Sequence, residues 1–170
     1  MVAKVFGSVL HGVEAFRITV EVHVGKGLGY HLTGQPDEGV NEGLGRAEVA
    51  IKGLGYSMPR TKLSINLSPA DIRKTGAGFD LPMAVGILLA SEQVFDSGVL
   101  KNHLVLGELG LDGSILPVRG PQCMASQALA DGMKGIILPR ANQQEAALVV
   151  GIHVSARRCW RGGCPPSCRR

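Results

Sequence analysis

Apolar and polar residues alternate along the first part of the chain. Between residues 16 and 24, apolar side chains take every second position, as Phe16, Ile18, Val20, Val22 and Val24. Such a period of two predicts a strand with one buried face. Residues 4–10, 30–33 and 62–67 are predicted as further strands. A turn at His11-Gly12 precedes the strand at 16–24, and a glycine-rich turn at residues 25–29 follows it.

Helices are predicted where apolar residues recur at three- and four-residue spacing. One is expected to begin after Pro36 and Asp37 and to end at Lys52, with Gly53 as the stop signal. Residues 81–94 are apolar on several sides and predict a buried helix, and Pro82 fits its first turn.

The second half of the chain mixes both kinds of element. Residues 104–108 and 114–118 are predicted to form a hairpin through Asp112-Gly113, a strong turn signal. Helices are predicted at 121–130 and 141–149, with strands at 135–138 and from about Ile152.

This order of elements indicates the fold class. Three strands precede the first helix, which argues against a doubly wound parallel sheet and favours a two-layer α+β domain. The 170 residues suit one domain, and 45% of them are hydrophobic, which excludes wholesale disorder.

Charge is distributed unevenly along the chain. The net charge of +4 depends on five arginines in residues 157–170, without which residues 1–156 carry 13 basic and 14 acidic residues. We therefore predict a folded domain at 1–156 and a disordered, basic, cysteine-containing tail at 157–170. The tail cysteines, Cys159, Cys164 and Cys168, lack the paired spacing of zinc sites, so no metal is expected.

No apolar run is long enough to span a bilayer, and the first residues lack the apolar region of a secretory signal. A cytoplasmic location without a membrane partner is the resulting expectation.

Several short motifs, in this order, together resemble the N-terminal domain of the YifB/ComM family of magnesium chelatase-like AAA+ ATPases. They are Lys4-Val5-Phe6-Gly7-Ser8, Gly34-Gln35-Pro36-Asp37, Tyr56-Ser57-Met58-Pro59-Arg60, residues 66–74, Phe79-Asp80-Leu81-Pro82-Met83-Ala84, Gly107-Glu108-Leu109 and Leu111-Asp112-Gly113. The resemblance covers about residues 2–155. It implies a ribosomal protein S5 domain 2-like fold, similar to the Lon protease domain.

The resemblance also implies a function. Full-length relatives carry an AAA+ motor that is linked to DNA processing in competence, so ATP, magnesium and a hexameric assembly are implied for that motor alone. This chain is expected to hold no cofactor, to perform no catalysis and to act as a regulatory or interaction domain for its motor. The alternatives are a DNA-binding module and a Lon-like Ser-Lys peptidase.

The residues bear on two enzyme interpretations of this chain, a Lon-like peptidase and an ATPase. Laid on the Lon pattern, the nucleophile position is Gly78 and the position of the basic lysine is Gln122, and neither residue can supply that chemistry. A phosphate-binding loop of the form Gly-x4-Gly-Lys-Ser/Thr does not occur in the sequence.

Charged residues near a glycine loop, Gly76-Ala77-Gly78, give the candidate contact surface. The candidates for a partner or nucleic-acid contact are Arg60, Lys62, Asp71, Arg73, Lys74 and Asp80. A second interpretation is structural: Asp80 would cap the helix that follows it, and Arg73 would pair with Asp71 or a neighbour.

Overall fold

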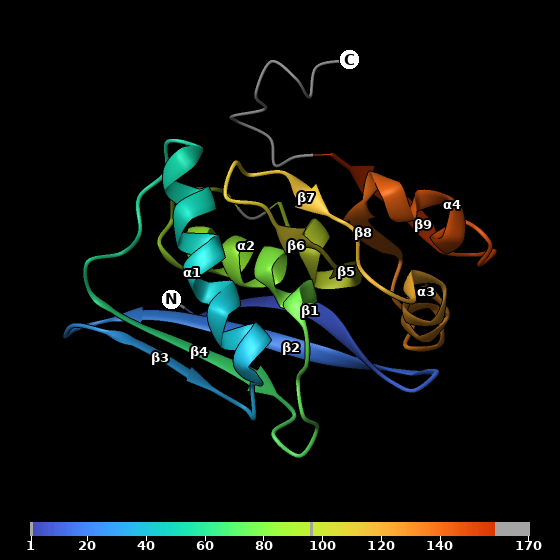
Figure 1. Ribbon diagram of the computed structural model, residues 1–170, viewed down its shortest axis with the longest axis horizontal. Coiled ribbons are helices and arrows are strands. Elements are labelled where there is room, and N and C mark those ends of the chain that lie inside the picture. The colour runs from blue at the N-terminus through green and yellow to red at the C-terminus, as the bar shows by residue number, and fades with distance from the viewer. Residues whose placement is uncertain (1, 96, 159–170) are drawn as a thin grey trace.

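The computed structural model describes residues 2–95 and 97–158 (Figure 1). Its elements are β1 (Val2–His11), β2 (Glu14–Gly25), β3 (Tyr30–Thr33), α1 (Glu38–Gly53), β4 (Lys62–Ser68), η1 (Ala77–Phe79), α2 (Asp80–Ala90), η2 (Val99–Asn102), β5 (His103–Val105), β6 (Glu108–Leu109), β7 (Ile115–Leu116), α3 (Pro121–Ala130), β8 (Gly135–Pro139), η3 (Arg140–Asn142), α4 (Gln143–Ala146) and β9 (His153–Arg157).

The main sheet has seven strands in the order β3-β4-β2-β1-β5-β8-β9. Antiparallel pairing joins β1, β2 and β4, whereas β5, β8 and β9 extend the sheet from β1 in parallel. The alternation at residues 16–24 sets the β2 register, because Ile18, Val20 and Val22 are all fully buried. The expected α+β architecture is therefore present.

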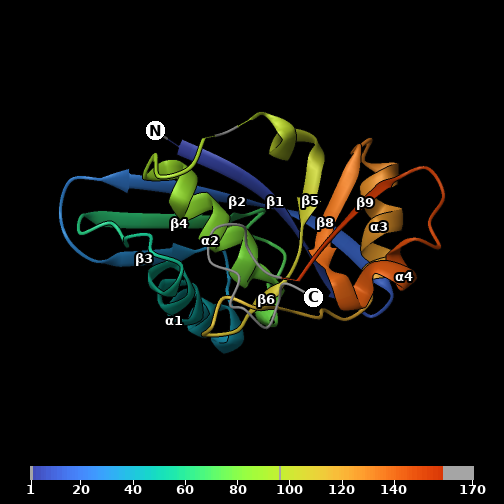
Figure 2. The same ribbon diagram turned by 90° about the horizontal axis from the view of Figure 1, so that it is seen from above.

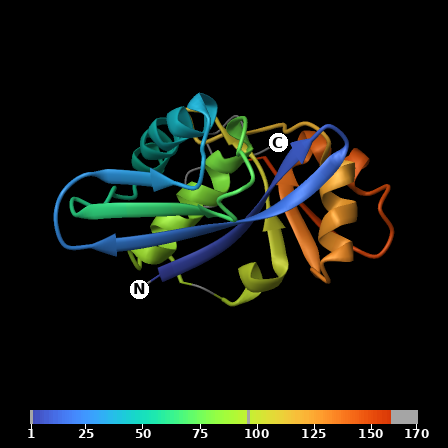
Figure 3. The same ribbon diagram turned by 90° about the horizontal axis from the view of Figure 1, so that it is seen from below.

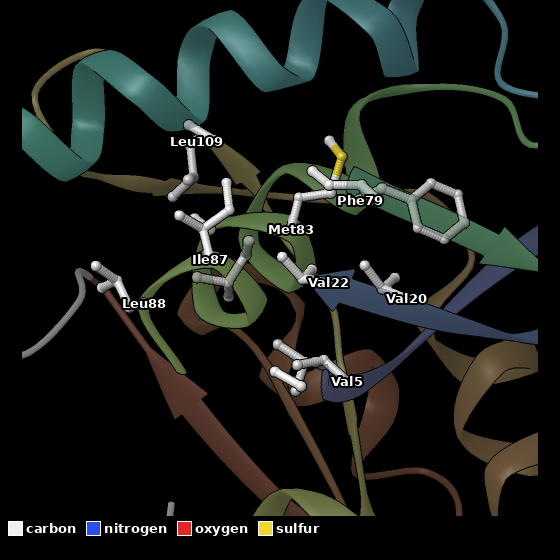
Figure 4. Close-up of a cluster of buried hydrophobic side chains, with 14 of the residues drawn as sticks. Val5, Val20, Val22, Phe79, Met83, Ile87, Leu88 and Leu109 are labelled. Carbon is white, nitrogen blue, oxygen red and sulfur yellow. The ribbon is translucent and has the colours of Figure 1, made fainter. Parts of the chain in front are cut away.

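Helices α1 and α2 cover one face of the sheet (Figures 1 and 2). Between them and the strands lies the larger hydrophobic cluster, in which Val20 and Val22 of β2 meet Met83 and Ile87 of α2 (Figure 4). Close approach depends on Gly86 of α2, where a β-carbon would lie 2.5 Å from Val22 Cγ2.

A second hydrophobic cluster lies on the opposite face, at the β8 end of the sheet. In β1, Val5 and Val9 belong to the first cluster, while Phe6 and Leu10 pack against the second. The second cluster contains Met124, Ala125 and Ala128 of α3 and Ala146 of α4. Alternating residues of one strand therefore serve two cores.

No helix covers the rest of that opposite face over β2, β4 and β3 (Figure 3). A row of hydrogen-bonded side chains crosses four strands here. Lys4 Nζ lies 2.9 Å from Glu21 Oε1, Asn66 donates to Glu21 Oε2 over 3.1 Å, and Thr33 donates to Asn66 over 3.0 Å. This row uses the polar positions that alternate with the buried ones.

Three predicted elements are shorter in the structure. Instead of one long hairpin over 104–118, β5 enters the main sheet, with Leu104 paired to Phe6 and Ile136, and only β6 and β7 form a hairpin. Those two partners are distant in sequence, so local pattern did not reveal them.

Helix α2 ends at Ala90 and not at residue 94. The chain turns through Glu92 at a positive φ of 57°, and the Gln93 amide binds both backbone groups of Ser57, at 2.7 Å each. The helix predicted at 141–149 is also shorter in the structure, where α4 spans only Gln143–Ala146. Strand β9 runs to Arg157, and residues 159–170 of the predicted tail lie outside the described residues.

Replacing Gly86 with alanine tests the packing of α2 on the sheet. The change should lower the free energy of unfolding by about 1–3 kcal/mol, because crowding against Val22 outweighs the helix propensity that alanine gains. Urea unfolding followed by circular dichroism measures it. Gly45→Ala in α1 is the matched control, since its β-carbon would meet nothing within 4 Å, and it should stabilise the chain by about 0.5–1 kcal/mol. Equal effects at the two positions would contradict the packing argument.

Candidate contact surface and the buried charges beneath it

The loop from Pro69 to Gly76 is tied to the start of α1. Asp37 caps that helix, accepting from Val40 N over 2.8 Å, while its other oxygen accepts from Gly76 N over 3.2 Å. Asp37 N donates to Lys74 O over 2.9 Å, and Lys74 N donates to Gln35 O over 3.1 Å. Backbone and carboxylate hydrogen bonds therefore hold the carboxyl-terminal end of this loop, at Lys74 and Gly76.

Asp71 and Arg73 lie on the exposed part of this loop, which projects beyond the end of β4 (Figure 1). His11 Nε2 lies 3.0 Å from the carbonyl oxygen of Arg73, which links the loop to the β1–β2 turn. No ion pair joins Arg73 to Asp71 among the described residues, so that expected pairing is not present. Both side chains face solvent.

Lys74 is buried, with a relative exposure of 0%. Its ammonium group donates a hydrogen bond to the carbonyl oxygen of Pro69. Burial lowers the pKa of Lys74, and the nearby charge of Asp71 opposes that shift. Lys74 therefore supports the loop from within and does not present its charge to a partner.

Asp80 is also fully buried, and it pairs with Arg46 of α1. Arg46 Nε donates to Asp80 Oδ2 over 2.7 Å and Arg46 Nη2 donates to Asp80 Oδ1 over 3.2 Å, a two-pronged contact. Leu109 N of β6 also donates to Oδ2, over 3.1 Å. Burial raises the pKa of Asp80, while Arg46 and the Leu109 N–H act in the opposite direction.

The predicted role of Asp80 as a helix cap is wrong. Asp80 is itself the first residue of α2, Phe79 precedes it as the cap residue, and no side chain makes a capping hydrogen bond there. The carboxylate instead turns toward α1 because Gly43 leaves room: a β-carbon at Gly43 would lie 2.2 Å from Asp80 Oδ1. Sequence reasoning missed Arg46, whose only signal was a cation on a largely apolar helix face.

Arg60 and Lys62 are exposed at the opposite end of β4 from the loop. Six residue steps along a strand span roughly 20 Å, so these two residues and Arg73 do not form one compact patch. Of the six candidate residues, the structure brings together Asp71, Arg73 and Lys74 at the surface loop, whereas Asp80 is buried at the start of α2.

The structure places the two residues that align with the Lon dyad in different elements. Gly78 lies in η1, where an added β-carbon would meet only Val118 Cγ1, at 3.6 Å. Gln122 lies in the first turn of α3 and lines an open groove of about 760 Å³ beside the β1–β2 turn. Within residues 2–95 and 97–158, no serine or threonine hydroxyl is hydrogen-bonded to a lysine or histidine side chain.

The same described residues contain no cluster of three or more His, Cys, Asp or Glu side chains able to hold a metal ion. None of the described helices combines the length and apolar character needed to cross a bilayer.

Comparison with known proteins defines the class. A family model described as subunit ChlI of Mg-chelatase matches residues 20–142. YifB of Escherichia coli is 42% identical over 141 residues, covering 82% of this chain and 28% of YifB. The competence protein ComM of Haemophilus influenzae is 37% identical over 150 residues, covering 86% of this chain and 29% of ComM.

The Lon protease of Trichlorobacter lovleyi is 26% identical over 141 residues, covering 79% of this chain and 17% of that protein. Together with the mixed sheet and four α-helices, these matches define a ribosomal protein S5 domain 2-like fold. The chain belongs to the magnesium chelatase ChlI-like family that includes YifB and ComM. It spans less than a third of the length of either YifB or ComM.

A double-mutant cycle tests the Asp80–Arg46 pair. Asp80→Asn and Arg46→Met should each lower the free energy of unfolding by about 2–4 kcal/mol, because the first takes the carboxylate from the half-buried Arg46 and the second leaves the buried Asp80 carboxylate without its counter-charge. The double variant should cost less than the sum of the two, because no charge is then left without a partner. Chemical denaturation of the four proteins gives the coupling energy, and strictly additive effects would show that the pair makes no net interaction.

The burial of Lys74 predicts a pH dependence of stability. Because the folded state lowers its pKa, the unfolded chain binds the proton more tightly between that lowered pKa and about 10.4, so the Lys74 contribution to stability increases as pH rises through this window. Lys74→Met should remove this increase when unfolding is measured from pH 7 upward. Lys62→Met, at an exposed position, is the control and should leave the slope of the unchanged chain in place. An identical slope in Lys74→Met would contradict the prediction.

Proposed function

We propose that this chain is a non-catalytic regulatory and interaction domain of a YifB/ComM-like AAA+ ATPase, linked to DNA processing in competence. The observation that carries the proposal is the pair of residues at the Lon dyad positions, Gly78 and Gln122. They occur in a chain that belongs to the ChlI-like family. Neither residue can act as a nucleophile or a titrating base.

The contact surface in this proposal is the loop that carries Asp71 and Arg73. Its charged side chains are exposed, while Asp37 and the buried Lys74 hold its backbone in place. A preformed loop loses little conformational entropy when a partner binds, so it suits a protein contact.

The motor is the proposed partner of this loop. ATP and magnesium would be bound by the motor, the hexamer would be assembled through it, and the location would be cytoplasmic. The chain itself would hold no cofactor.

Two alternatives receive less support. A DNA-binding module was expected to gather Arg60, Lys62, Arg73 and Lys74, yet Lys74 is buried and the first two lie at the far end of β4. A Lon-like peptidase would need a nucleophile and base that the two dyad positions do not offer.

Binding to a motor in trans tests the proposal. We expect the purified chain to bind the part of Escherichia coli YifB outside its matched segment and to change the rate at which that part hydrolyses ATP. Asp71→Ala combined with Arg73→Ala should weaken this binding about tenfold, because two exposed charged side chains are removed together. Isothermal titration calorimetry and a phosphate-release assay measure the two effects.

Arg60→Ala is the matched control, because it removes an exposed charge at the other end of β4 and should leave the affinity unchanged. Casein cleavage or ATP hydrolysis by the purified chain alone would overturn the non-catalytic assignment. Absence of any binding to the motor would overturn the interaction role.

A further inference from the structure

Two histidines flank a glycine across three neighbouring strands, β5, β8 and β9, which lie side by side in Figure 2. The register pairs His103 of β5 with Gly135 of β8, and Gly135 with His153 of β9. The residues one step further along belong to the second hydrophobic cluster or pack against it: Leu104, Ile136 and Val154. Because successive side chains of a strand point to opposite faces, His103 and His153 share the other face of the sheet.

The two imidazole rings lie close together because Gly135 has no side chain between them. Their centroids are 6.4 Å apart and their planes meet at 75°. A β-carbon at Gly135 would lie 2.5 Å from His103 Cδ2 and 2.6 Å from His103 Nε2, so this edge of the ring occupies the space above the glycine. Nε2 of His103 therefore reaches over β8 in the direction of β9.

A backbone contact fixes which nitrogen of His103 is available to a ligand. His103 Nδ1 lies 2.7 Å from the carbonyl oxygen of Val99. A carbonyl oxygen only accepts, so Nδ1 carries the proton, and in the neutral ring Nε2 keeps its lone pair. Imidazoles that bind metal ions in proteins are commonly oriented in this way, through a hydrogen bond from the second ring nitrogen.

His153 offers the second imidazole. It is exposed, and within the part of the chain that the structure describes its ring makes no hydrogen bond or ion pair, so the ring is free to turn. A metal ion lies roughly 2.0–2.1 Å from each ligating nitrogen, so two nitrogens that share one ion come within about 4 Å of each other. Rings whose centroids are 6.4 Å apart reach this separation once His153 turns a nitrogen toward His103 Nε2.

We propose that His103 and His153 form a binding site for a divalent transition-metal ion. Imidazole nitrogen suits Zn²⁺, Cu²⁺ and Ni²⁺, whereas Mg²⁺ and Ca²⁺ prefer oxygen ligands. The pair supplies two ligands, and water completes the coordination of the ion. The ion joins β5 to the edge strand β9 across β8, as a structural cross-link and not as the cofactor of a reaction. No residue of this site belongs to the β4 loop, so the site does not depend on the proposed contact with a motor.

Zinc titration of the full chain tests the site. Thiols of the predicted tail would compete for the ion, so the background variant combines Cys159→Ser, Cys164→Ser and Cys168→Ser. Isothermal titration calorimetry with Zn²⁺ should show one bound ion per chain. In this background, His103→Ala and His153→Ala should each weaken zinc binding at least about tenfold, because each removes one of the two protein ligands.

A second histidine pair on the same sheet gives the matched control. His23 of β2 and His31 of β3 flank Ser64 of β4, since both pair with it in the register. No ring contact joins these two histidines among the described residues, and the His23 ring lies over Gly25, where a β-carbon would be 2.8 Å from its Cε1. His23→Ala combined with His31→Ala removes two imidazoles and should leave the zinc affinity unchanged.

Proton NMR of the imidazole signals gives a readout that does not rely on the variants being equally stable. The chain has five histidines, and zinc should shift the signals of two of them, those that are missing from the spectra of His103→Ala and His153→Ala. Circular dichroism shows whether each variant is folded. If an alanine variant does not fold, the number of imidazole signals that shift in the background variant decides.

One zinc ion that needs both His103 and His153, and that still binds without His23 and His31, supports the site. The proposal is overturned if zinc does not bind, if either histidine of the pair suffices alone, or if the control variant loses zinc binding equally. Each of these results would leave the proposed motor contact intact, because the motor assay uses a different loop and different variants.

Discussion

The pair between the buried Asp80 and the half-buried Arg46 is the interaction on which the helical layer depends. It joins α1 to the first residue of α2, and the same carboxylate accepts from the backbone of β6. Taking a carboxylate out of water is costly, so the charge is tolerated only because three donors converge on it. The absence of a side chain at Gly43 is what allows the helices to approach closely enough.

The surface loop from Pro69 to Gly76 is also held by charged side chains that bond to the backbone. Its carboxyl-terminal end is fixed by Asp37, and the buried ammonium group of Lys74 donates to the carbonyl oxygen of Pro69 at its start. These two charged residues therefore support the loop, while Asp71 and Arg73 remain exposed to solvent. A charged sequence motif need not be a charged surface, because the fold decides which side chains reach water.

The loop at one end of β4 is the candidate contact surface. At the β4 end, the loop is preorganised by backbone hydrogen bonds, which suits a protein contact.

The sequence by itself determined much of the fold. The alternation at residues 16–24 set the buried face of β2, Asp37 and Gly53 marked the ends of α1, and ordered motifs indicated the family. These features are local, so they can be read from residue type and spacing.

Only the tertiary structure decided the partners of the charged residues. It turned Asp80 away from its predicted cap toward Arg46 and buried Lys74. It also moved Leu104 from a predicted hairpin into the main sheet. Each of these contacts joins segments distant in sequence, and their energies depend on burial and on which strands become neighbours, which no local pattern encodes.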